Sequence, residues 1–496
     1  MSKLISFFII LLSISTVQAG RIVYPGKSCP AIVQRGTELE ILYYTHNRAY
    51  VRSIDSVILR SQFCRIGLPV QNVEYGKFVY DDYTELFATY RITVGIPEGI
   101  PEDMFDLIVK IETGTSVMPR SVKIVKEFSR RHKFIHISDP HVSRQVIQTE
   151  HGDYARELEL LDKFTDVANL IAPDFVIVTG DLVHEVTRLD ADSTGYTGYL
   201  INNRSDIGPY FDEKLRYYFQ GAMGFSGVWG IDAPVFSTPG NHDYYGIASD
   251  DSQGKCRQWN NALGKRVYGF SYAGTRVIVT DDFMGDTIRD RPITAPMSGL
   301  QGDMIRRFFE AEGKGDLIVW GKHHYGRIDS AFMNDNKVGI ILHGHSHSPR
   351  EEWIGTRPTL NTRPGTICRS NNAHIWKQTL GFFRVFTIDG DRFESTKPLR
   401  FCSNPTATYD RLKLNLTLNY VHPNDGTQRS NEAIIENKLD AAFEAGRIRF
   451  VMPKGRYSVS QGRIDQSFDS GERTVVDVRI DIPRHKTIRV AIFPKS

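Results

Sequence analysis

Five short clusters of aspartate, asparagine and histidine lie in the middle of this sequence, and each one directly follows an apolar run. The apolar runs, among them FIHIS, FVIVT and VGIIL, have the length and composition of buried strands. Because sites in open α/β sheets gather at the carboxyl ends of the strands, we expect the five clusters to meet in space. The clusters are Asp139-Pro140-His141, Gly180-Asp181, Gly240-Asn241-His242-Asp243, Gly321-Lys322-His323-His324 and His343-Gly344-His345-Ser346-His347.

The side chains in these clusters suit divalent metal ions of borderline softness. Carboxylate, amide and imidazole groups are ligands for Mn, Fe, Zn and Co, and the clusters contain no cysteine. They offer more ligands than one ion needs, and one aspartate can bridge two ions through its two oxygens. Two ions about 3.5–4 Å apart suit in-line attack on phosphorus. The residues therefore predict two divalent ions and an anionic substrate such as a phosphate ester.

The five clusters resemble the motifs of the calcineurin-like metallophosphoesterases, in which D-x-H, G-D, G-N-H-D/E, H and G-H-x-H follow in this order. The resemblance extends over about residues 134–398, with 268–282 matching peripheral strands of that family. It implies a four-layer α/β/β/α sandwich with a dinuclear site. One ion would be held by Asp139, His141, Asp181 and His347, and the other by Asp181, Asn241, His323 and His345, with Asp181 as the bridge.

Within this resemblance, the run after Pro239-Gly240 has three roles. Asn241 would supply a neutral oxygen to a metal ion and contact the substrate. His242 would lie beside the ions without binding them, and would bond a phosphate oxygen or protonate the leaving alkoxide. Asp243 would orient His242 and raise its basicity. We therefore predict His242 and Asp243 as catalytic residues, with Asn241 and His242 in contact with substrate.

Other polar residues near the clusters leave alternatives open. The family pattern favours His323 over His324 as a ligand, but Tyr325 stands where a proline usually follows the pair. His343 is expected to pack or bond locally. The aromatic-rich insertion at 193–230 is expected to overhang the cleft and select the leaving group, or simply to pack. Four further side chains are close enough to be considered for substrate contact, although solvated positions are the default for them: His184, Glu185, Arg350 and Arg363.

The expected activity is hydrolysis of phosphate esters by in-line attack of a metal-bridging hydroxide. Phosphodiesters are favoured, because purple acid phosphatases lack the histidine that is His141 here and carry a tyrosine where this chain has His184. The alternatives are a phosphomonoesterase of the acid-phosphatase type and a non-catalytic binding protein that uses its flanking β domains. A nuclease is disfavoured, because a net charge of +3 over 496 residues provides no strongly basic surface. The oligomeric state is left open.

The first 19 residues predict a secretory signal peptide. Lys3 precedes an apolar run from Leu4 to Ile14, and Val17-Gln18-Ala19 has the small-x-small pattern of a cleavage site. The run is shorter than the roughly 20 residues of a membrane-spanning helix, so no transmembrane anchor is expected. We predict a secreted or periplasmic protein.

The remaining chain divides into three predicted domains. Residues 20–128 contain short alternating runs separated by Gly and Pro, which predicts a small antiparallel β-sandwich. Residues 129–398 alternate helical and strand patterns, as α/β domains do. Residues 399–496 return to strand patterns and predict a second sandwich of the immunoglobulin or fibronectin type, with one helix at 432–445.

Cysteines and glycosylation sequons add two further expectations. An exported chain can hold disulfides, and Cys29 with Cys64 and Cys368 with Cys402 are candidate pairs, although the sequence does not determine the pairing. Cys256 is left over. Asn203 and Asn415 lie in sequons.

Overall fold

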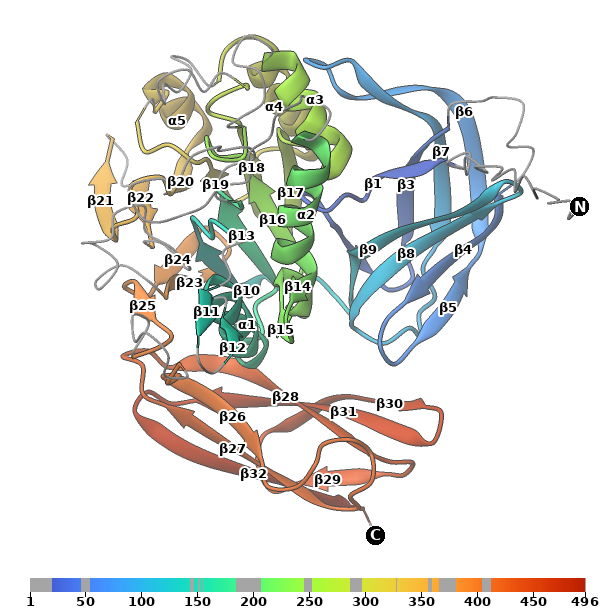
Figure 1. Ribbon diagram of the computed structural model, residues 1–496, viewed down its shortest axis with the longest axis vertical. Coiled ribbons are helices and arrows are strands. Elements are labelled where there is room, and N and C mark those ends of the chain that lie inside the picture. Colours follow the sequence, from blue (N-terminus) through green and yellow to red (C-terminus); the bar gives the residue numbers. More distant parts are fainter. Residues whose placement is uncertain are drawn as a thin grey trace, which may run out of the picture.

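The chain folds into two β-sandwiches that flank a central α/β part (Figure 1). The expected signal peptide, Asn203, His184 and Glu185 lie outside the described residues. The computed structural model describes residues 20–45, 54–142, 147–149, 152–154, 156–183, 207–244, 252–285, 297–326, 328–355, 359–364, 381–403 and 412–495.

The N-terminal sandwich buries the apolar side of each strand. In β3 (Glu38–Tyr44), for example, Leu39, Ile41 and Tyr43 are buried, as period-two alternation predicts. One sheet has the order β1 (Arg21–Tyr24), β3, β7 (Leu86–Gly95), β6 (Val70–Asp81). The other has the order β2 (Ala31–Gln34), β9 (Gly114–Val125), β8 (Met104–Ile111), β4 (Ile54–Arg60), β5 (Arg65–Leu68).

One strand pair departs from the predicted antiparallel sandwich. Strand β2 runs parallel to β9, with Ala31 opposite Val122. The chain leaves the first sheet after β1 and crosses over before it joins the second sheet at its edge, so the pair is not a hairpin.

The central part contains two stacked sheets. The first has the order β16 (Val235–Thr238), β13 (Phe175–Thr179), β10 (Arg131–Ile137), β23 (Phe382–Asp389), β24 (Arg392–Ser395), and β25 (Leu399–Arg400) pairs with β23. The second has the order β17 (Tyr268–Tyr272), β18 (Thr275–Val279), β19 (Leu317–Gly321), β20 (Val338–Leu342), β22 (Thr359–Arg363), β21 (Arg350–Ile354). Side chains from both sheets, including Phe134, Phe175, Val277 and Val319, form the core between them.

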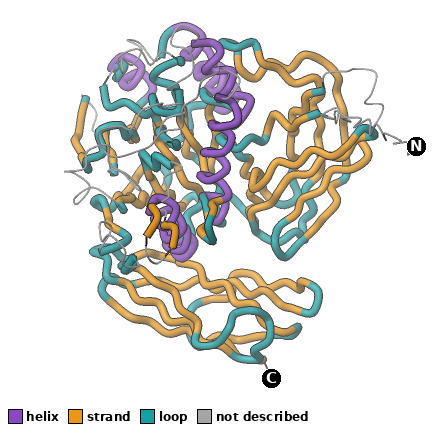
Figure 2. The backbone as a smooth tube through the Cα atoms, in the orientation of Figure 1, coloured by secondary structure: helices purple, strands orange, loops and turns teal. Residues whose placement is uncertain are grey.

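Helices cover the outer faces of these two sheets. On the first sheet, α1 (Arg156–Ile171), α2 (Ile207–Gln220) and α3 (Ser252–Ala262) share one core with strand residues such as Ile135 and Val176. On the second, α4 (Gly299–Glu312) and α5 (Ser330–Asn336) pack on residues such as Trp320 and Ile341. The predicted four-layer α/β/β/α sandwich is therefore confirmed. Figure 2 shows that the described helices are confined to this part.

The described part of the insertion packs into the fold. Tyr218 and Phe219 of α2 are buried in the core beneath the first sheet.

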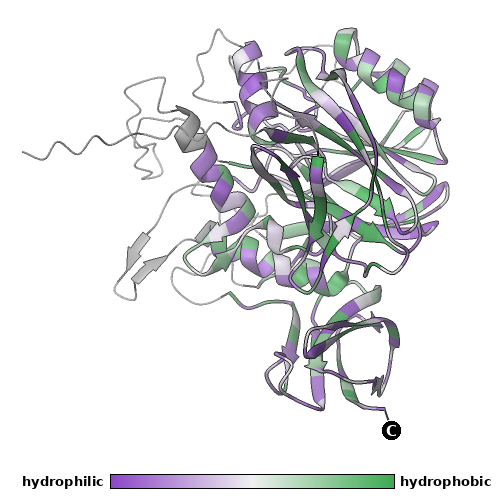
Figure 3. Ribbon diagram, turned by 90° about the vertical axis from the view of Figure 1, so that its right-hand side faces the viewer, coloured by the Kyte–Doolittle hydropathy of each residue, from purple (hydrophilic) through white to green (hydrophobic). Residues whose placement is uncertain are grey.

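Figure 3 shows mixed hydropathy along the outer helices and hydrophobic central strands. Short elements complete this region: β11 (Ile147–Thr149), β12 (Gly152–Tyr154), β14 (Gly221–Ala222), β15 (Phe225–Ser226) and the 3-10 helix η3 (Val228–Gly230).

The C-terminal sandwich also has two sheets, and the helix predicted at 432–445 is wrong. The segment forms β27 (Asn431–Asn437) and the start of β28 (Phe443–Pro453). In β27, Ala433 and Ile435 are buried while Glu432, Ile434 and Glu436 are half-buried. This alternation lets a strand bury one face, and tertiary packing overrides the helical preference of Glu and Ala. The sheet orders are β26 (Leu416–Tyr420), β27 (Asn431–Asn437), β32 (Lys486–Pro494), β29 (Tyr457–Val459), and β28 (Phe443–Pro453), β31 (Arg473–Ile482), β30 (Arg463–Ser470).

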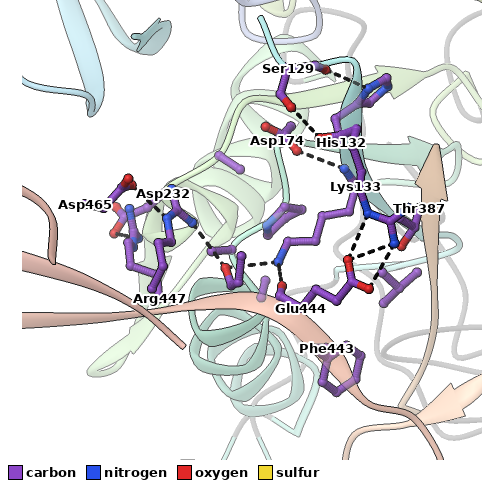
Figure 4. Close-up of a pocket in the computed structure, with 18 of the residues that line it drawn as sticks. Ser129, His132, Lys133, Asp174, Asp232, Thr387, Phe443, Glu444, Arg447 and Asp465 are labelled. Atoms are coloured by element: carbon purple, nitrogen blue, oxygen red, sulfur yellow. Dashed lines mark hydrogen bonds and ion pairs between the residues drawn. The ribbon is translucent and has the colours of Figure 1, made fainter. Parts of the chain in front are cut away.

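Asp232 links all three parts of the chain. This residue of the central part pairs with Arg120 of the N-terminal sandwich at 2.8 Å and with Arg447 and Arg449 of the C-terminal sandwich. Beside it, at the junction, lies a cavity of about 720 Å³ to which all three parts contribute (Figure 4). Lys133, which also lines this cavity, donates to the backbone carbonyls of Glu444 and Ala445. The sandwiches are therefore docked on the central part by specific polar contacts.

The described residues include both cysteines of one expected disulfide and one cysteine of the other. Cys29 and Cys64 are free thiols, so the predicted pairing between them is wrong, because Cys29 is buried in the core between the two central sheets. Cys402 is buried and its candidate partner Cys368 lies outside the described residues. Asn415 is half-buried and its side-chain amide donates to the Arg400 carbonyl at 2.9 Å. No helix in the described ranges is long and apolar enough to cross a membrane.

Candidate metal centre

The seven predicted ligands come together where strands of both central sheets end. Strands β10, β13 and β16 are parallel neighbours in the first sheet, and β19 and β20 are parallel neighbours in the second. Each ligand lies within a few residues of a strand end, so stacking the two sheets brings them together. In chain order they follow β10 (Asp139, His141), β13 (Asp181), β16 (Asn241), β19 (His323) and β20 (His345, His347).

The first group consists of Asp139, His141, Asp181 and His347, with ligand atoms all within 4.8 Å of one another. His141 Nε2 lies 3.4 Å from Asp181 Oδ2 and 2.9 Å from His347 Nε2. His347 Nε2 lies 3.2 Å from Asp139 Oδ1. Two imidazole nitrogens and two carboxylates thus converge on one point.

The second group shares Asp181 with the first. Its other two members are His323 and His345, again with ligand atoms within 4.8 Å of one another. His323 Nε2 lies 3.2 Å from Asp181 Oδ2, and the Asn241 side-chain oxygen lies 3.1 Å from both His323 Nε2 and His345 Nδ1. A neutral oxygen, a carboxylate and two imidazoles therefore face each other beside the first group.

The charges in these groups fit a bound cation. Asp139 and Asp181 are fully buried, which opposes ionisation, yet His347 and His141 hold the pKa of Asp139 well below its usual range. The pKa of His323 is raised to about 10 although burial opposes this, because Asp181 lies beside it. Asp181 thus favours the protonated form of His323, and a divalent cation of borderline softness would compensate the same buried carboxylate with this donor set.

Five of the seven predicted ligands adopt left-handed backbone conformations. Such φ values are uncommon for residues other than glycine and cost of order 1–3 kcal/mol each. They persist where surrounding contacts impose them, as the hydrogen bond from the His141 amide to the Asp181 carbonyl (2.8 Å) does here. The fold thus retains strained backbone at the residues that would hold the ions. The φ values are 54° for Asp139, 47° for His141, 53° for Asp181, 69° for His345 and 53° for His347.

Two glycines allow the loops of this site to approach closely. A Cβ on Gly240 would lie 2.2 Å from Asp181 Oδ1, and one on Gly344 would lie 1.8 Å from Ser138 Oγ. Both contacts are far shorter than van der Waals separation. The glycines of the G-N-H-D and G-H-x-H runs are therefore needed so that Asp181 and Asp139 can be covered by neighbouring backbone.

His242 and Asp243 lie next to the first group. The His242 ring packs edge-on against the His141 ring at 4.6 Å and is 8% exposed, while its backbone amide donates to Asp181 Oδ1 at 2.9 Å. The Asp243 carboxylate accepts hydrogen bonds from the amides of Gly240 (2.8 Å) and Val183 (3.2 Å). In the structure, Asp243 therefore braces the turn that carries Asn241 and His242.

The two adjacent histidines after β19 have different surroundings. His323 is fully buried, its Nδ1 donates to the Thr179 carbonyl at 2.7 Å, and its Nε2 faces Asp181. The His324 ring instead accepts a hydrogen bond from the Gly326 amide. The geometry thus brings His323 into the second group and leaves His324 beside it.

The other described residues that the sequence suggested are not members of the two ligand groups. His343 is buried, and neither of its ring nitrogens has a hydrogen-bond partner within the described residues. Arg363 is 7% exposed and binds Ser348, and Arg350 is exposed.

Two aspartates that were not predicted as site residues support the ligand-bearing loops by hydrogen bonds. Asp282 Oδ2 accepts hydrogen bonds from the amides of both His323 (2.9 Å) and His324 (2.6 Å). Asp281 Oδ2 accepts from the Tyr244 hydroxyl and from Arg266, both at 2.6 Å. The sequence contains a pattern that could have identified them. The run TDD follows the apolar run RVIV, just as each of the five clusters follows an apolar run.

Comparison with known proteins agrees with this geometry. The family model for calcineurin-like phosphoesterases matches residues 132–349. No curated protein matches.

Solved structures with a similar chain path were also found. A conserved uncharacterized protein from Streptococcus pneumoniae, a predicted phosphoesterase, is 14% identical over 53% of this chain and 87% of its own, with a TM-score of 0.23. GAP50 of Plasmodium, described as the anchor in the inner membrane complex, is 12% identical over 57% and 89%, with a TM-score of 0.32. Zinc-complexed Vps29 from Entamoeba histolytica is 10% identical over 53% and 98%, with a TM-score of 0.20. Together with the family match, the site geometry leads to one conclusion: residues 132–349 of this chain are a calcineurin-like phosphoesterase domain.

Proposed function

We propose that this protein is a secreted or periplasmic phosphoesterase that holds two divalent ions and prefers phosphodiesters. The observation that carries the proposal is the sharing of Asp181 by two buried ligand groups. A single metal site would need only one of these groups, whereas a shared carboxylate suits two ions side by side.

The residues divide naturally between two ions. Asp139, His141, Asp181 and His347 would hold one, and Asp181, Asn241, His323 and His345 would hold the other. When bound, such a pair supplies Lewis-acid polarisation of a phosphoryl oxygen and a water of lowered pKa. Mn, Fe, Zn and Co all suit this donor set.

The protein's own contribution is to fix the ligands and to meet the substrate. The Thr179 carbonyl fixes the tautomer of His323 by accepting from Nδ1, which leaves Nε2 to face Asp181. The His242 amide orients Asp181 by donating to Oδ1. The His242 side chain, which is 8% exposed and packs edge-on against His141, would bond a phosphate oxygen or the leaving-group oxygen.

The preference for diesters rests on the D-x-H motif. His141 occupies the position that lacks histidine in purple acid phosphatases, and it lies within the first group. A phosphomonoesterase of the acid-phosphatase type is the alternative. Export rests on the pattern of residues 1–19.

The test is hydrolysis of bis(p-nitrophenyl) phosphate and p-nitrophenyl phosphate by the full mature chain. The protein is stripped with a chelator and then assayed with and without manganese or zinc. We expect metal-restored activity, faster on the diester, that is lost in Asn241→Ala and retained in Asn336→Ala, which alters a helix residue away from the site. Absence of bound metal would overturn the proposal, and faster hydrolysis of the monoester would favour the alternative. Mass spectrometry of exported protein, with an N-terminus at Gly20, tests the export step.

A further inference from the structure

Two arginines lie directly opposite each other at the edge of the metal centre. Strands β21 and β22 pair antiparallel, and Arg350 is opposite Arg363. Strand β21 begins three residues after His347, so this pair is at the end of the hairpin next to the site. Like charges directly opposite each other destabilise a strand pair. Glu352 compensates part of this charge, since it pairs with Arg350 at 2.7 Å and also accepts from the side-chain amide of Asn361.

Arg363 is held in a fixed orientation. Its Nε donates to the Ser348 carbonyl at 2.6 Å and its Nη2 donates to the Ser348 hydroxyl at 3.2 Å. In the described part of the chain, Nη1 has no hydrogen-bond partner. Burial and the neighbouring Arg350 lower the pKa of Arg363, while Asp139 of the metal centre opposes this. Through Ser348, the guanidinium is anchored to the residue that directly follows His347 of the first ligand group.

Tyr325 connects this arginine pair to the second ligand group. Its ring lies under the Arg363 guanidinium at 5.6 Å and 6.3 Å from the His345 ring, and it is 45% exposed. The ring stacks on His324 at 4.6 Å, which fixes its position. Tyr325 is therefore exposed between His345 and the two arginines, of which Arg350 has a side chain that is 51% exposed while Arg363 is 7% exposed.

We infer that Arg363 and Arg350, with Tyr325 as the intervening wall, form a subsite for a second anionic group on the substrate. The inference rests on the proposed function and narrows its substrate to phosphate esters whose leaving group carries a further phosphate, phosphonate or carboxylate. Guanidinium groups bind such anions through charge-assisted hydrogen bonds. A purely structural role for Arg363, in which it only supports the loop through Ser348, is the alternative that the test must separate.

Three matched esters test the subsite: 4-carboxyphenyl phosphate, 4-phosphonophenyl phosphate and the uncharged methyl ester of the first, used as monoesters or methyl diesters. We expect the wild type to prefer the two anionic esters, mainly through KM. Arg363→Gln should lower the ratio of kcat/KM for anionic over uncharged ester about tenfold, as loss of one charge-assisted hydrogen bond does. Arg350→Gln, at a more exposed position, should lower it about threefold. Arg489→Gln, on the C-terminal sandwich, should leave it unchanged.

The outcomes separate the possible explanations. An equal fall on all three esters in Arg363→Gln, with no effect of Arg350→Gln on the ratio, would assign Arg363 a structural role and overturn the inference. Preference for only the phosphonate or only the carboxylate would identify which anion is bound. If Arg363→Gln does not fold, the ratio in Arg350→Gln decides. Hydrolysis of none of the esters by metal-loaded wild type would overturn the proposed function and the inference with it.

Discussion

The Tyr244 hydroxyl donates a 2.6 Å hydrogen bond to Oδ2 of Asp281, and both residues are fully buried. The same oxygen accepts from Arg266, whose Nε lies 3.1 Å from Asp81 at the end of β6. A buried chain of polar contacts thus connects the N-terminal sandwich to the loop that carries Asn241 and His242.

Replacing Tyr244 tests whether these polar contacts position the loop that carries Asn241 and His242. Tyr244→Phe removes the hydroxyl without changing the ring, so we expect a loss of about 1 kcal/mol in unfolding free energy. Activity should fall about tenfold through kcat, because the loop that carries His242 loses an anchor. Tyr420→Phe is the matched control, since its hydroxyl donates a 2.7 Å bond to the Arg449 carbonyl in the C-terminal sandwich. Equal activity in the two variants would show that Tyr244 acts only on stability.

Asp282→Ala tests the support behind the second ligand group. Without this carboxylate, the backbone amides of His323 and His324 lose their acceptor, so the backbone that positions the His323 ring loses a contact. We expect the manganese concentration for half-maximal activity to rise at least about tenfold, as with other outer ligands of metal-binding histidines. Asp329→Ala removes the N-cap of nearby α5 and should cost about 1 kcal/mol of stability without changing the metal requirement. An unchanged requirement in Asp282→Ala would contradict the expected role.

Metal removal should change thermal stability through Asp181. A ligand that binds only the folded state stabilises it by about 2.7 kcal/mol at 100 times its Kd. We therefore expect chelation to lower the midpoint of thermal unfolding and added manganese or zinc to restore it. Asp181→Asn should abolish both shifts because it weakens both ligand groups at once. Asp335→Asn, on exposed α5, should retain them. A chelator effect that persists in Asp181→Asn would place the bound metal elsewhere.

Asp232 gives the protein a defined acid sensitivity. Although burial opposes it, Arg447 and Arg120 hold the pKa of Asp232 far below its usual value. A carboxyl with a depressed folded-state pKa stabilises the fold above its unfolded-state pKa of about 3.9, and this contribution is lost as pH falls below that value. Asp232→Asn should therefore lose about 2–3 kcal/mol at pH 7, less than for a fully buried pair because the side chain is 23% exposed.

Denaturant unfolding from pH 7 to pH 3 checks the role of Asp232. The difference between wild type and Asp232→Asn should be constant down to about pH 5 and should shrink below about pH 4. Asp303→Asn breaks an exposed helical pair with Arg306 and should change stability by less than about 1 kcal/mol. A difference that stays constant to pH 3 would show that the charge of Asp232 is not what matters.

The clustering of the seven candidate ligands was predictable because each one follows an apolar strand within a few residues. The strand end places the side chain, and the two sheets need only stack for the groups to meet, as Asp181 and His323 do. The supporting residues were harder to find, since Asp281 and Asp282 act on backbone amides and a tyrosine rather than through a recognisable spacing. The choice between His323 and His324 required side-chain directions that adjacent positions in a sequence do not reveal.

Errors in the fold prediction arose where local preference and long-range packing disagree. Residues 432–445 contain Glu, Ala and Leu, which favour helix, but β27 pairs with β26 and β32 on both sides and buries one face of the strand. The Cys29–Cys64 pairing failed for a similar reason, because Cys29 belongs to a core made by distant segments. Neither long-range contact is visible in a short window of sequence.

Helix α1 is buried on more than one face. Leu160, Phe164 and Ile171 belong to one continuous core with the first central sheet and with the C-terminal residues Phe443, Ile448 and Ile482. Glu159 also accepts a hydrogen bond from the Leu412 amide. Replacing residues 399–496 with an unrelated domain would therefore expose an apolar, aggregation-prone stripe on α1 of the central part. The central and C-terminal parts are therefore expected to be inherited as one unit, and substitutions on α1 are expected to co-occur with substitutions in strand β28.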